Sequence, residues 1–406
     1  MSRLVTRALF LARWLTLAAI VGVIAGLGSA AFIAGLNWAT TTRGDNAWLI
    51  WLLPAAGLVI GAMYHYSGRG FERGSNLVID QIHQTSHWIT PRMSVLVYVG
   101  SVITHLFGGS AGREGGAIQI AVGLTDPISK KLRFSQQSRS MMLVTAIAGA
   151  FGAAFGVPFA GTIFALEVQR VGRVKYEALI PAFTAAVVGD AVVRGVDIHH
   201  TMYPKLPEYN WNFETVWKLV ALGVLAGVVA YLFVNGTHLV QKTAGRMISW
   251  YPARPAIGGA IVAAMVLWFG WRDYQGLSIP LALDAFAGDD ARSWIPKLIL
   301  TIVTIGFGFV GGEVIPLFVM GSLLGSNLSD LLNIDPTLLS SMGAVAVLGA
   351  AANVPLACIV LGIELFGGSN ALMFALVCIV AYAVSGHRSV YHAQIVDAPK
   401  WTRSGD

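Results

Sequence analysis

Long apolar runs separated by short polar turns recur along almost the whole chain. Such runs are typical of helices that cross a lipid bilayer, where a helix satisfies its own backbone polar groups. Several runs are shorter than the roughly 20 residues that a spanning helix needs, and glycine or proline interrupts them. The pattern therefore predicts a polytopic helical membrane protein with some helices broken inside the bilayer. The apolar segments lie near residues 8–36, 47–64, 93–107, 117–126, 141–166, 177–194, 214–240, 255–271, 296–310, 314–332, 340–352, 355–367 and 369–385.

Two short patterns occur once in each half of the chain. A Val-Pro-x-Ala pattern that ends in Glu167 recurs 197 residues later and ends there in Glu364. A glycine-glutamate break at residues 112–114 recurs 199 residues later, at residues 311–313. Two repeats with breaks at matching positions predict a transporter whose site lies between the repeats, near the middle of the membrane. We interpret Glu167 and Glu364 as packing or capping residues.

A polar stretch at residues 197–212 divides the chain near its middle. We expect residues 1–196 to form the first membrane repeat and residues 213–390 to form the second. Residues 391–406 then form a short C-terminal tail, and no regulatory domain is expected.

Composition and charge agree with a membrane protein. Hydrophobic residues make up 55% of the chain and charged residues 12%, whereas about 25% of a soluble domain is charged. The net charge of +6 is modest, and nucleic acid is not expected as a partner. We interpret the basic clusters as the positive bias of cytoplasmic loops, with binding of lipid headgroups as the alternative. The clusters are Arg3/Arg7/Arg13, Lys130/Lys131/Arg133/Arg139 and Arg170/Arg173/Lys175.

The sequence gives little evidence for a metal site, a disulfide or a catalytic site. Cys358 and Cys378 lie in apolar runs and fit small core residues, and no metal-ligand spacing occurs. Residues 108–112 match the G-x-S-x-G pattern of serine hydrolases around Ser110, with His105 close in sequence. That motif belongs on a strand-to-helix turn, which an all-helical chain lacks. A five-residue match also occurs easily by chance in a chain with 46 glycines. An intramembrane serine hydrolase is therefore a remote alternative.

The glycine-rich breaks predict an anion site. A glycine turn before a helix exposes backbone N–H groups without partners, and the positive end of the helix dipole lies there too. Three helix starts of this kind occur, at residues 74–76, 112–115 and 311–316. We expect amides from several half-helices to hold a dehydrated anion and to repel a cation.

Glu114 lies inside the second break, where a charge at membrane depth predicts a function. Its carboxylate can occupy the anion site as an intramolecular competitor, and protonation lets it leave, which couples one proton to anion occupancy. The alternative is a carboxylate that only caps a helix. Arg113 is expected either to face an aqueous vestibule or to extend to the surface. Glu313 is interpreted as a proton carrier, with a buried structural carboxylate as the alternative.

Together these motifs resemble those of the CLC family of anion channels and proton-coupled antiporters. Residues 112–115 (GREG) resemble the family's G-K/R-E-G gating motif, and residues 155–167 and 352–366 resemble its two P-x-x-G/A…E helices. Residues 312–316 (GEVIP) stand at the third motif, and Tyr391 matches the tyrosine that points at the anion. The resemblance covers nearly the whole chain and implies a homodimer with a separate anion pathway in each subunit.

Within that family the motifs are most similar to those of the fluoride-exporting branch, because the third motif reads GGEVIP. Chloride/proton antiporters often carry a proton-transfer glutamate where this chain has Val168, which favours Glu313 as the proton carrier. The fluoride branch commonly has Met or Asn in place of Ser75 and Thr in place of Ile315, and chloride-selective members have Ser at the first position. A CLC-type chloride transporter and a passive anion channel therefore remain alternatives.

The sequence thus predicts an all-α polytopic membrane protein of two inverted-topology repeats, built from tilted and broken helices. We expect a proton-coupled antiporter, and not an enzyme, that exports fluoride across the cytoplasmic (inner) membrane without cofactor or metal. Its expected partners are fluoride or chloride, protons, the lipid bilayer and a second copy of the chain. Glu114 and Glu313 are predicted to gate the pathway and to couple it to protons. The predicted anion-binding residues are Ser75, Asn76, Gly112, Arg113, Gly115, Val314, Ile315 and Tyr391.

Overall fold

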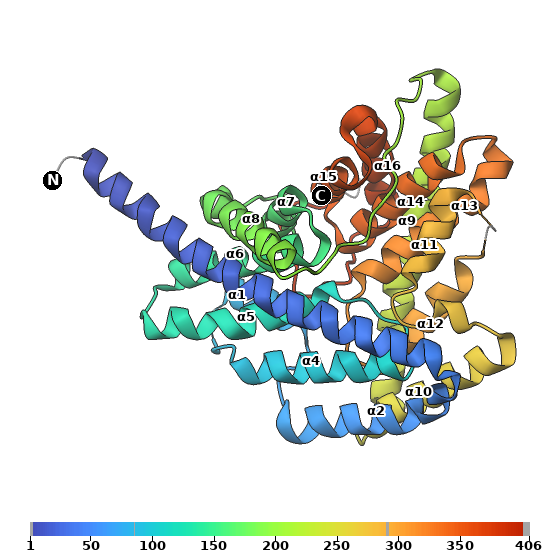
Figure 1. Cartoon of the computed structure of the whole chain (residues 1–406), viewed down its shortest axis with the longest axis horizontal. Coiled ribbons are helices and arrows are strands. Elements are labelled where there is room, and N and C mark those ends of the chain that lie inside the picture. Colours follow the sequence, from blue (N-terminus) through green and yellow to red (C-terminus); the bar gives the residue numbers. More distant parts are fainter. Residues whose placement is uncertain (1–2, 85, 290–291, 401–406) are drawn as a thin grey trace, which may run out of the picture.

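The computed structural model describes residues 3–84, 86–289 and 292–400, so the end of the predicted tail, residues 401–406, lies outside the description. Within these ranges the chain forms sixteen α-helices and one short pair of parallel strands. Figure 1 shows most helices of the first half of the chain on one side and most of those of the second half on the other, with the first blue helices reaching across below the second half. The all-α prediction is confirmed.

The first half contains helices α1 to α8. Proline begins α4 and α7, where its missing N–H costs no hydrogen bond. The helices are α1 Arg3–Asp45, α2 Leu53–Ala62, α3 Ser75–His83, α4 Pro91–Leu106, α5 Glu114–Lys131, α6 Gln136–Phe155, α7 Pro158–Glu167 and α8 Leu179–Gly195. Short helical turns cover Ala47–Leu52 (η1), Met63–Ser67 (η2) and Tyr176–Ala178 (η3), and strand β1 covers Arg170–Val171.

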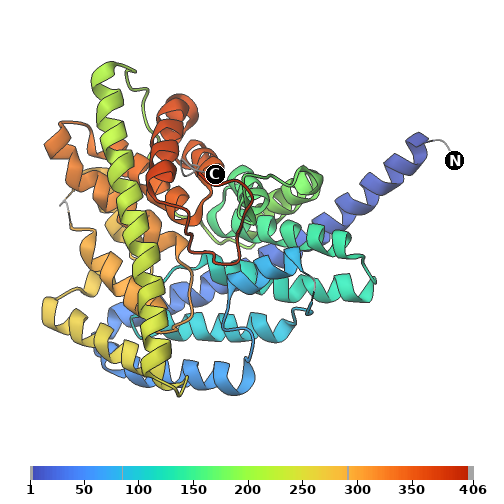
Figure 2. The same cartoon turned by 180° about the vertical axis from the view of Figure 1, so that it is seen from behind.

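The second half contains helices α9 to α16. The long helix α9 crosses the second half in Figure 2, and the side chain of Asn212 caps its first turn by accepting from the N–H of Thr215 at 2.8 Å. The helices are α9 Phe213–Met247, α10 Ala253–Phe269, α11 Ile279–Ala287, α12 Ile295–Gly306, α13 Val314–Leu332, α14 Pro336–Ala352, α15 Pro355–Phe366 and α16 Ala371–Val384. Short helical turns cover Arg272–Tyr274 (η4) and Gly368–Asn370 (η5), and strand β2 covers Ile395–Val396.

Helix lengths agree with broken membrane helices. Among the described residues, six helical segments are long and apolar enough to cross a membrane, and other apolar helices, such as α12 and α15, are shorter. The apolar segment expected near residues 141–166 is not one element. It turns at Gly156, whose φ of +74° ends α6 in the left-handed region, and Pro158 begins α7. The spanning segments are residues 8–45, 47–67, 136–155, 176–195, 213–247 and 314–332.

Two glutamates connect the halves at α7 and α15. Glu364, near the end of α15, accepts hydrogen bonds from two backbone N–H groups in the first turn of α7, at 3.1 and 2.6 Å. Glu167, at the end of α7, accepts two from the first turn of α15, at 3.1 and 2.8 Å. Each carboxylate therefore caps the helix of the other half, which confirms the capping interpretation of both residues.

We expect Glu167→Gln to lower the free energy of unfolding by about 1–2 kcal/mol, because a neutral amide oxygen is a weaker acceptor at a helix N-terminus than a carboxylate. The midpoint of thermal unfolding in detergent measures the change. Glu208→Gln, which alters an exposed carboxylate, is the matched control. Equal midpoints for Glu167→Gln and wild type would contradict the capping role.

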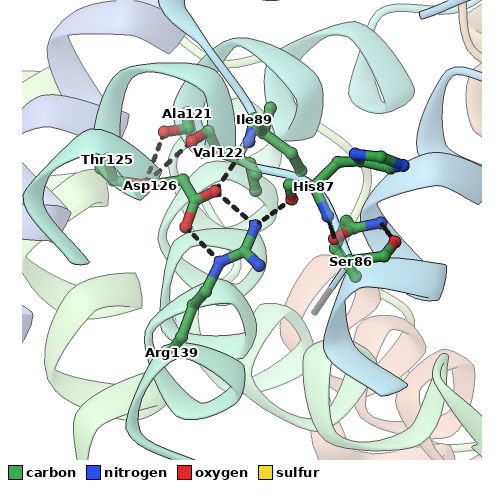
Figure 3. A network of polar contacts seen from close by, with 9 residues as sticks. Ser86, His87, Ile89, Ala121, Val122, Thr125, Asp126 and Arg139 are labelled. Atoms are coloured by element: carbon green, nitrogen blue, oxygen red, sulfur yellow. Dashed lines mark hydrogen bonds and ion pairs between the residues drawn. The ribbon is translucent and has the colours of Figure 1, made fainter. Parts of the chain in front are cut away.

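A buried ion pair fixes the segment between α3 and α4 (Figure 3). Arg139 donates two hydrogen bonds to the carboxylate of Asp126, at 2.8 and 2.7 Å, and both side chains are buried. The same carboxylate accepts the N–H of Ile89 at 2.9 Å, and the guanidinium donates to the carbonyl of His87 at 2.7 Å. Its carbon lies 4.3 Å from the ring centroid of Trp88. Arg139 is thus a buried structural cation, which corrects its assignment to a cytoplasmic basic cluster.

The C-terminal segment runs back between the halves, as the dark red trace of Figure 2 shows. Strand β2 pairs in parallel with β1, so that Arg170 lies opposite Ile395. The N–H of Val390 donates to the carbonyl of Ala351 at 3.0 Å. These contacts hold the intervening residue Tyr391 inside the protein, where it is 3% exposed.

The connector between the predicted repeats forms no helix or strand from residue 196 to residue 212, all of which the structure describes. Its Leu206 donates an N–H group to the carbonyl of Phe366 at 2.8 Å, so the connector lies against the end of α15. The repeat boundaries at residues 196 and 213 stay predictions.

Candidate functional site

The breaks that precede α5 and α13 lie against each other. The N–H of Gly112 donates to the carbonyl of Gly312 at 2.6 Å, and the N–H of Gly312 donates to the carbonyl of Gly112 at 2.8 Å. This reciprocal pair is an antiparallel bridge. A local two-fold axis relates two segments that pair in this way, as inverted repeats require.

The bridge also corrects the alignment of the two breaks. The sequence motifs align Glu114 with Glu313, and that register is wrong by one residue. Because Gly112 pairs with Gly312, the counterpart of Glu313 is Arg113, and both of these residues are N-caps of their helices. Glu114 begins α5 itself. We call the contact between residues 112–115 and 311–316 the junction. The two glutamates therefore hold different positions in it.

Glycine is required where the two breaks touch. A Cβ atom on Gly312 would lie 2.8 Å from the backbone nitrogen of Gly115, closer than real Cβ atoms approach. The chain also turns at Gly108 and Gly308, with φ of +92° and +96°, values that favour glycine. The glycines thus allow two backbones to approach closely enough to pair.

The carboxylate of Glu114 lies between the two helix starts. Its Oε2 atom accepts the N–H of Arg113 at 3.2 Å and the N–H of Ile315, in the first turn of α13, at 3.3 Å. The side chain is fully buried, and Oε1 has no hydrogen-bond partner among the described residues. The carboxylate thus occupies a place where N–H groups from both halves converge, which is the place predicted for the anion.

Arg113 is buried beside this carboxylate. It is 6% exposed, and its Nε atom lies 3.6 Å from Oε1 of Glu114. The expectation that it extends to the surface is wrong. Its backbone N–H belongs to the junction, because Glu114 accepts it. A guanidinium this close stabilises either the carboxylate or an anion that replaces it.

Gly112 was predicted to bind the anion, but its backbone N–H group already has a partner. Its N–H donates to Gly312 and is therefore not free to bind an anion in this conformation. Gly115 lies close to the other break, since a Cβ atom on it would lie 3.3 Å from the Cα atom of Gly312. Val314 and Ile315 are both buried in the first turn of α13, where Ile315 contributes its backbone N–H.

A cavity of about 500 Å³ reaches the junction, and we call it the vestibule. Four predicted site residues line it: Ser75, Asn76, Glu313 and Tyr391. Its wall also carries further charged and titratable side chains. These are Arg73, Arg254, His238 and His392, with Glu72 as the further acidic residue.

Gln119 is a vestibule residue that the sequence reasoning missed. Its side-chain N–H₂ group donates to the carbonyl of Gly115 at 3.0 Å and to the hydroxyl of Ser75 at 3.4 Å. It thereby connects the start of α3 to α5. The sequence signal is a polar residue in an apolar run, five residues after Glu114.

Asn76 and Tyr391 are brought to the vestibule from distant parts of the chain. The side-chain oxygen of Asn76 accepts the N–H of Ala393 at 3.0 Å, so this amide holds the C-terminal segment in place. The Tyr391 hydroxyl is buried and has no hydrogen-bond partner among the described residues. A buried O–H group without a partner is a donor available to a ligand.

The geometry does not support a serine hydrolase built on Ser110 and His105. The Ser110 hydroxyl is within 2.8 Å of the Thr301 hydroxyl, and both residues are fully buried. The ring nitrogens of His105 face the carbonyls of Ser101 and Ala111, at 2.8 and 3.1 Å. His105 is therefore not placed to take a proton from Ser110.

Two relatives are similar to this chain over most of its length. The chain is 40% identical over 404 residues to the chloride/fluoride channel protein of Pseudomonas syringae pv. tomato, which covers 97% of this chain and 89% of the relative. It is 25% identical to the H(+)/Cl(-) exchange transporter ClcA of Klebsiella pneumoniae subsp. pneumoniae, over 86% of this chain and 80% of the relative.

Solved structures show the same fold. A CLC-type fluoride/proton antiporter matches with a TM-score of 0.92 and 30% identity, over 95% of this chain and 98% of that one. A slow cyanobacterial Cl-/H+ antiporter matches in fold alone, with a TM-score of 0.79 and 21% identity, over 93% of this chain and 96% of that one. The model of the voltage gated chloride channel family matches residues 56–386. The chain therefore belongs to the voltage gated chloride channel, or CLC, family.

Proposed function

We propose that this protein is a proton-coupled anion antiporter that exports fluoride across the cytoplasmic (inner) membrane. The observation that carries the proposal is the position of the Glu114 carboxylate, which accepts N–H groups from both breaks. While it is charged, the carboxylate blocks the place of the anion. When it is protonated, it binds these amides more weakly and can leave. Anion binding and the charged form of Glu114 exclude each other, and that exclusion is the basis of exchange.

Glu313 carries protons between the vestibule and the junction. It lines the vestibule and is half-buried, and it belongs to the break that is bridged to the break of Glu114. The position that holds a proton-transfer glutamate in many chloride/proton antiporters is the buried Val168 in this chain. Glu313 is therefore the acidic group that the vestibule offers next to the gate.

Fluoride as the substrate is supported by relatives whose names include it. A fluoride ion is small and strongly hydrated, so its site must supply good donors in place of water. The unpartnered hydroxyl of Tyr391 and the N–H of Ile315 are such donors. Chloride is the second candidate, because the hydroxyl of Ser75 lines the vestibule.

The membrane and a second subunit complete the proposed assembly. Apolar side chains are exposed on α7, α15 and α16, with exposed fractions of 57% for Phe159, 51% for Leu356 and 71% for Leu372. Side chains of this kind need an apolar environment. We place a second copy of the chain on this face and lipid around the rest, with one anion pathway in each subunit.

We expect liposomes that contain the protein to release fluoride at least about tenfold faster than chloride, a difference of about 1.4 kcal/mol in barrier height. Ion-selective electrodes measure the efflux, and a pH electrode measures proton movement in the opposite direction. Protein-free liposomes are the control. Chloride efflux that equals or exceeds fluoride efflux would replace fluoride by chloride as the substrate. Fluoride efflux without proton movement would indicate a passive channel.

A further inference from the structure

A second cavity, of about 680 Å³, lies at the end of α3, and we call it the basic pocket. Three parts of the chain form it: the end of α3, the start of α6, and the segment from Gln169 to η3. Its polar side chains far outnumber its apolar ones. The lining residues are Ile82, His83, Gln136, Gln137, Ser140, Gln169, Arg170, Arg173, Val174, Lys175, Tyr176 and Glu177.

Three cationic side chains within six residues converge on this pocket. Lys175 donates a hydrogen bond to the hydroxyl of Ser140 at 2.6 Å, and Arg173 is largely exposed, with 75% of its side chain accessible. Arg170 lies beside them. The acidic residue of the lining, Glu177, is exposed and accepts from the side-chain amide of Gln137 at 3.4 Å. The lining therefore carries an excess of positive charge.

The two arginines already hold an oxyanion. Asp397, in the C-terminal segment, places Oδ2 at 3.1 Å from Nη1 of Arg170 and at 3.9 Å from Nε of Arg173. The pairing of β2 with β1 brings this carboxylate to them. The longer distance to Arg173 leaves most donors of that guanidinium available, and a guanidinium matches the oxygens of a phosphate.

The basic pocket lies on the face that carries the other basic clusters. Arg13, near the start of α1, lies over the ring of Phe134 at 5.5 Å, in the turn between α5 and α6. Lys130 and Lys131 end α5 just before this turn, and Gln136 begins α6 just after it and lines the pocket. By the positive-inside rule this face is cytoplasmic.

The pocket also adjoins exposed apolar side chains. Tyr176 lines the pocket and is 73% exposed, and Ile180, one helical turn further on, is 50% exposed. An exposed tyrosine next to exposed aliphatic side chains is typical of the membrane–water interface. A cationic pocket in this position matches a phosphate group with apolar chains attached.

We propose that the basic pocket binds a phosphate-bearing anion, either the headgroup of an anionic phospholipid or a soluble phosphate compound. Arg173 and Lys175 bind the phosphate oxygens by charge-assisted hydrogen bonds. The side-chain amide of Gln136, which uses one N–H on the carbonyl of His83, supplies its other N–H as a neutral donor. The bound phosphate neutralises part of the positive charge of the two arginines, as the carboxylate of Asp397 already does. This site is separate from the anion pathway and does not depend on the transported ion.

Equilibrium binding to the purified full-length protein in detergent tests the site. The probes are dioctanoyl phosphatidylglycerol, dioctanoyl phosphatidylcholine and inorganic phosphate, each titrated into the wild type and into Arg173→Gln/Lys175→Gln. We expect the double variant to bind phosphatidylglycerol at least about tenfold more weakly. The control, Lys130→Gln/Lys131→Gln, removes the same charge from the same face outside the pocket and should bind as the wild type does.

The outcomes separate the two sources of phosphate. Binding of phosphatidylglycerol that inorganic phosphate does not displace assigns the pocket to a lipid. Inorganic phosphate that binds equally well, and loses affinity in the same variant, assigns it to a soluble compound. Equal loss in the control variant, unchanged binding in the pocket variant, or equal binding of zwitterionic phosphatidylcholine overturns the proposal. If the double variant does not fold, Arg173→Gln, at an exposed side chain, gives the same test.

Discussion

Replacing Glu114 with glutamine should abolish proton movement coupled to anion flux, with proton counterflow reduced at least about tenfold. Glutamine has nearly the same shape as the protonated glutamate and can still accept the N–H groups of Arg113 and Ile315. It cannot bind or release a proton at neutral pH, so occupancy of the anion place no longer depends on pH. Anion efflux and external pH, recorded together from liposomes, measure both quantities.

The control for this experiment is Glu167→Gln. It also replaces a buried carboxylate that accepts two backbone N–H groups, but at the helix caps and away from the junction. It should keep the ratio of protons to anions while lowering stability. If Glu114→Gln retains the wild-type ratio, Glu114 is only a helix cap and the gate lies elsewhere.

The replacement Asp126→Asn should destabilise the protein by about 3–5 kcal/mol. It leaves the guanidinium of Arg139 buried without its carboxylate, and it weakens the bond to the N–H of Ile89 (Figure 3). Thermal unfolding in detergent should show a midpoint lower by at least about 5 °C. The ion pair fixes the segment that follows α3, and α3 begins at the vestibule residue Ser75. Anion transport should therefore fall as well.

A matched control uses the same substitution in an exposed pair. Asp273 pairs with Arg292, and their side chains are 57% and 41% exposed, so Asp273→Asn should change stability by less than about 1 kcal/mol. The double variant Asp126→Leu/Arg139→Met removes both buried charges and should recover much of the loss. A midpoint for Asp126→Asn equal to that of Asp273→Asn would show that the buried pair contributes little.

Most of the fold follows from glycine, proline and apolar length. The breaks near Gly112 and Gly312 can be recognised in the sequence because glycines interrupt otherwise apolar runs. The structure places these two breaks in contact. The turn at Gly156 cannot be recognised from hydropathy, because the helices on either side of it, α6 and α7, are both apolar and both mostly buried. Only the glycine-valine-proline order marks it.

The site was harder to predict than the fold, because three-dimensional pairing decides it. Matching letters aligned Glu313 with Glu114, whereas the backbone bridge makes Arg113 the counterpart of Glu313. Gln119 had no motif, since its role comes from contact with Ser75, which lies on another helix. The N–H of Gly112 looked available in sequence because nothing local indicates that Gly312 accepts it.

The exchanged glutamate caps make each half of the chain incomplete by itself. Neither half carries the acceptor for its own helix start, since Glu364 serves α7 and Glu167 serves α15. An isolated half would leave the first backbone N–H groups of α7 or of α15 without this acceptor. Separate expression of the two halves should therefore yield a folded protein only when both are produced together, and a stable isolated half would contradict this mutual dependence.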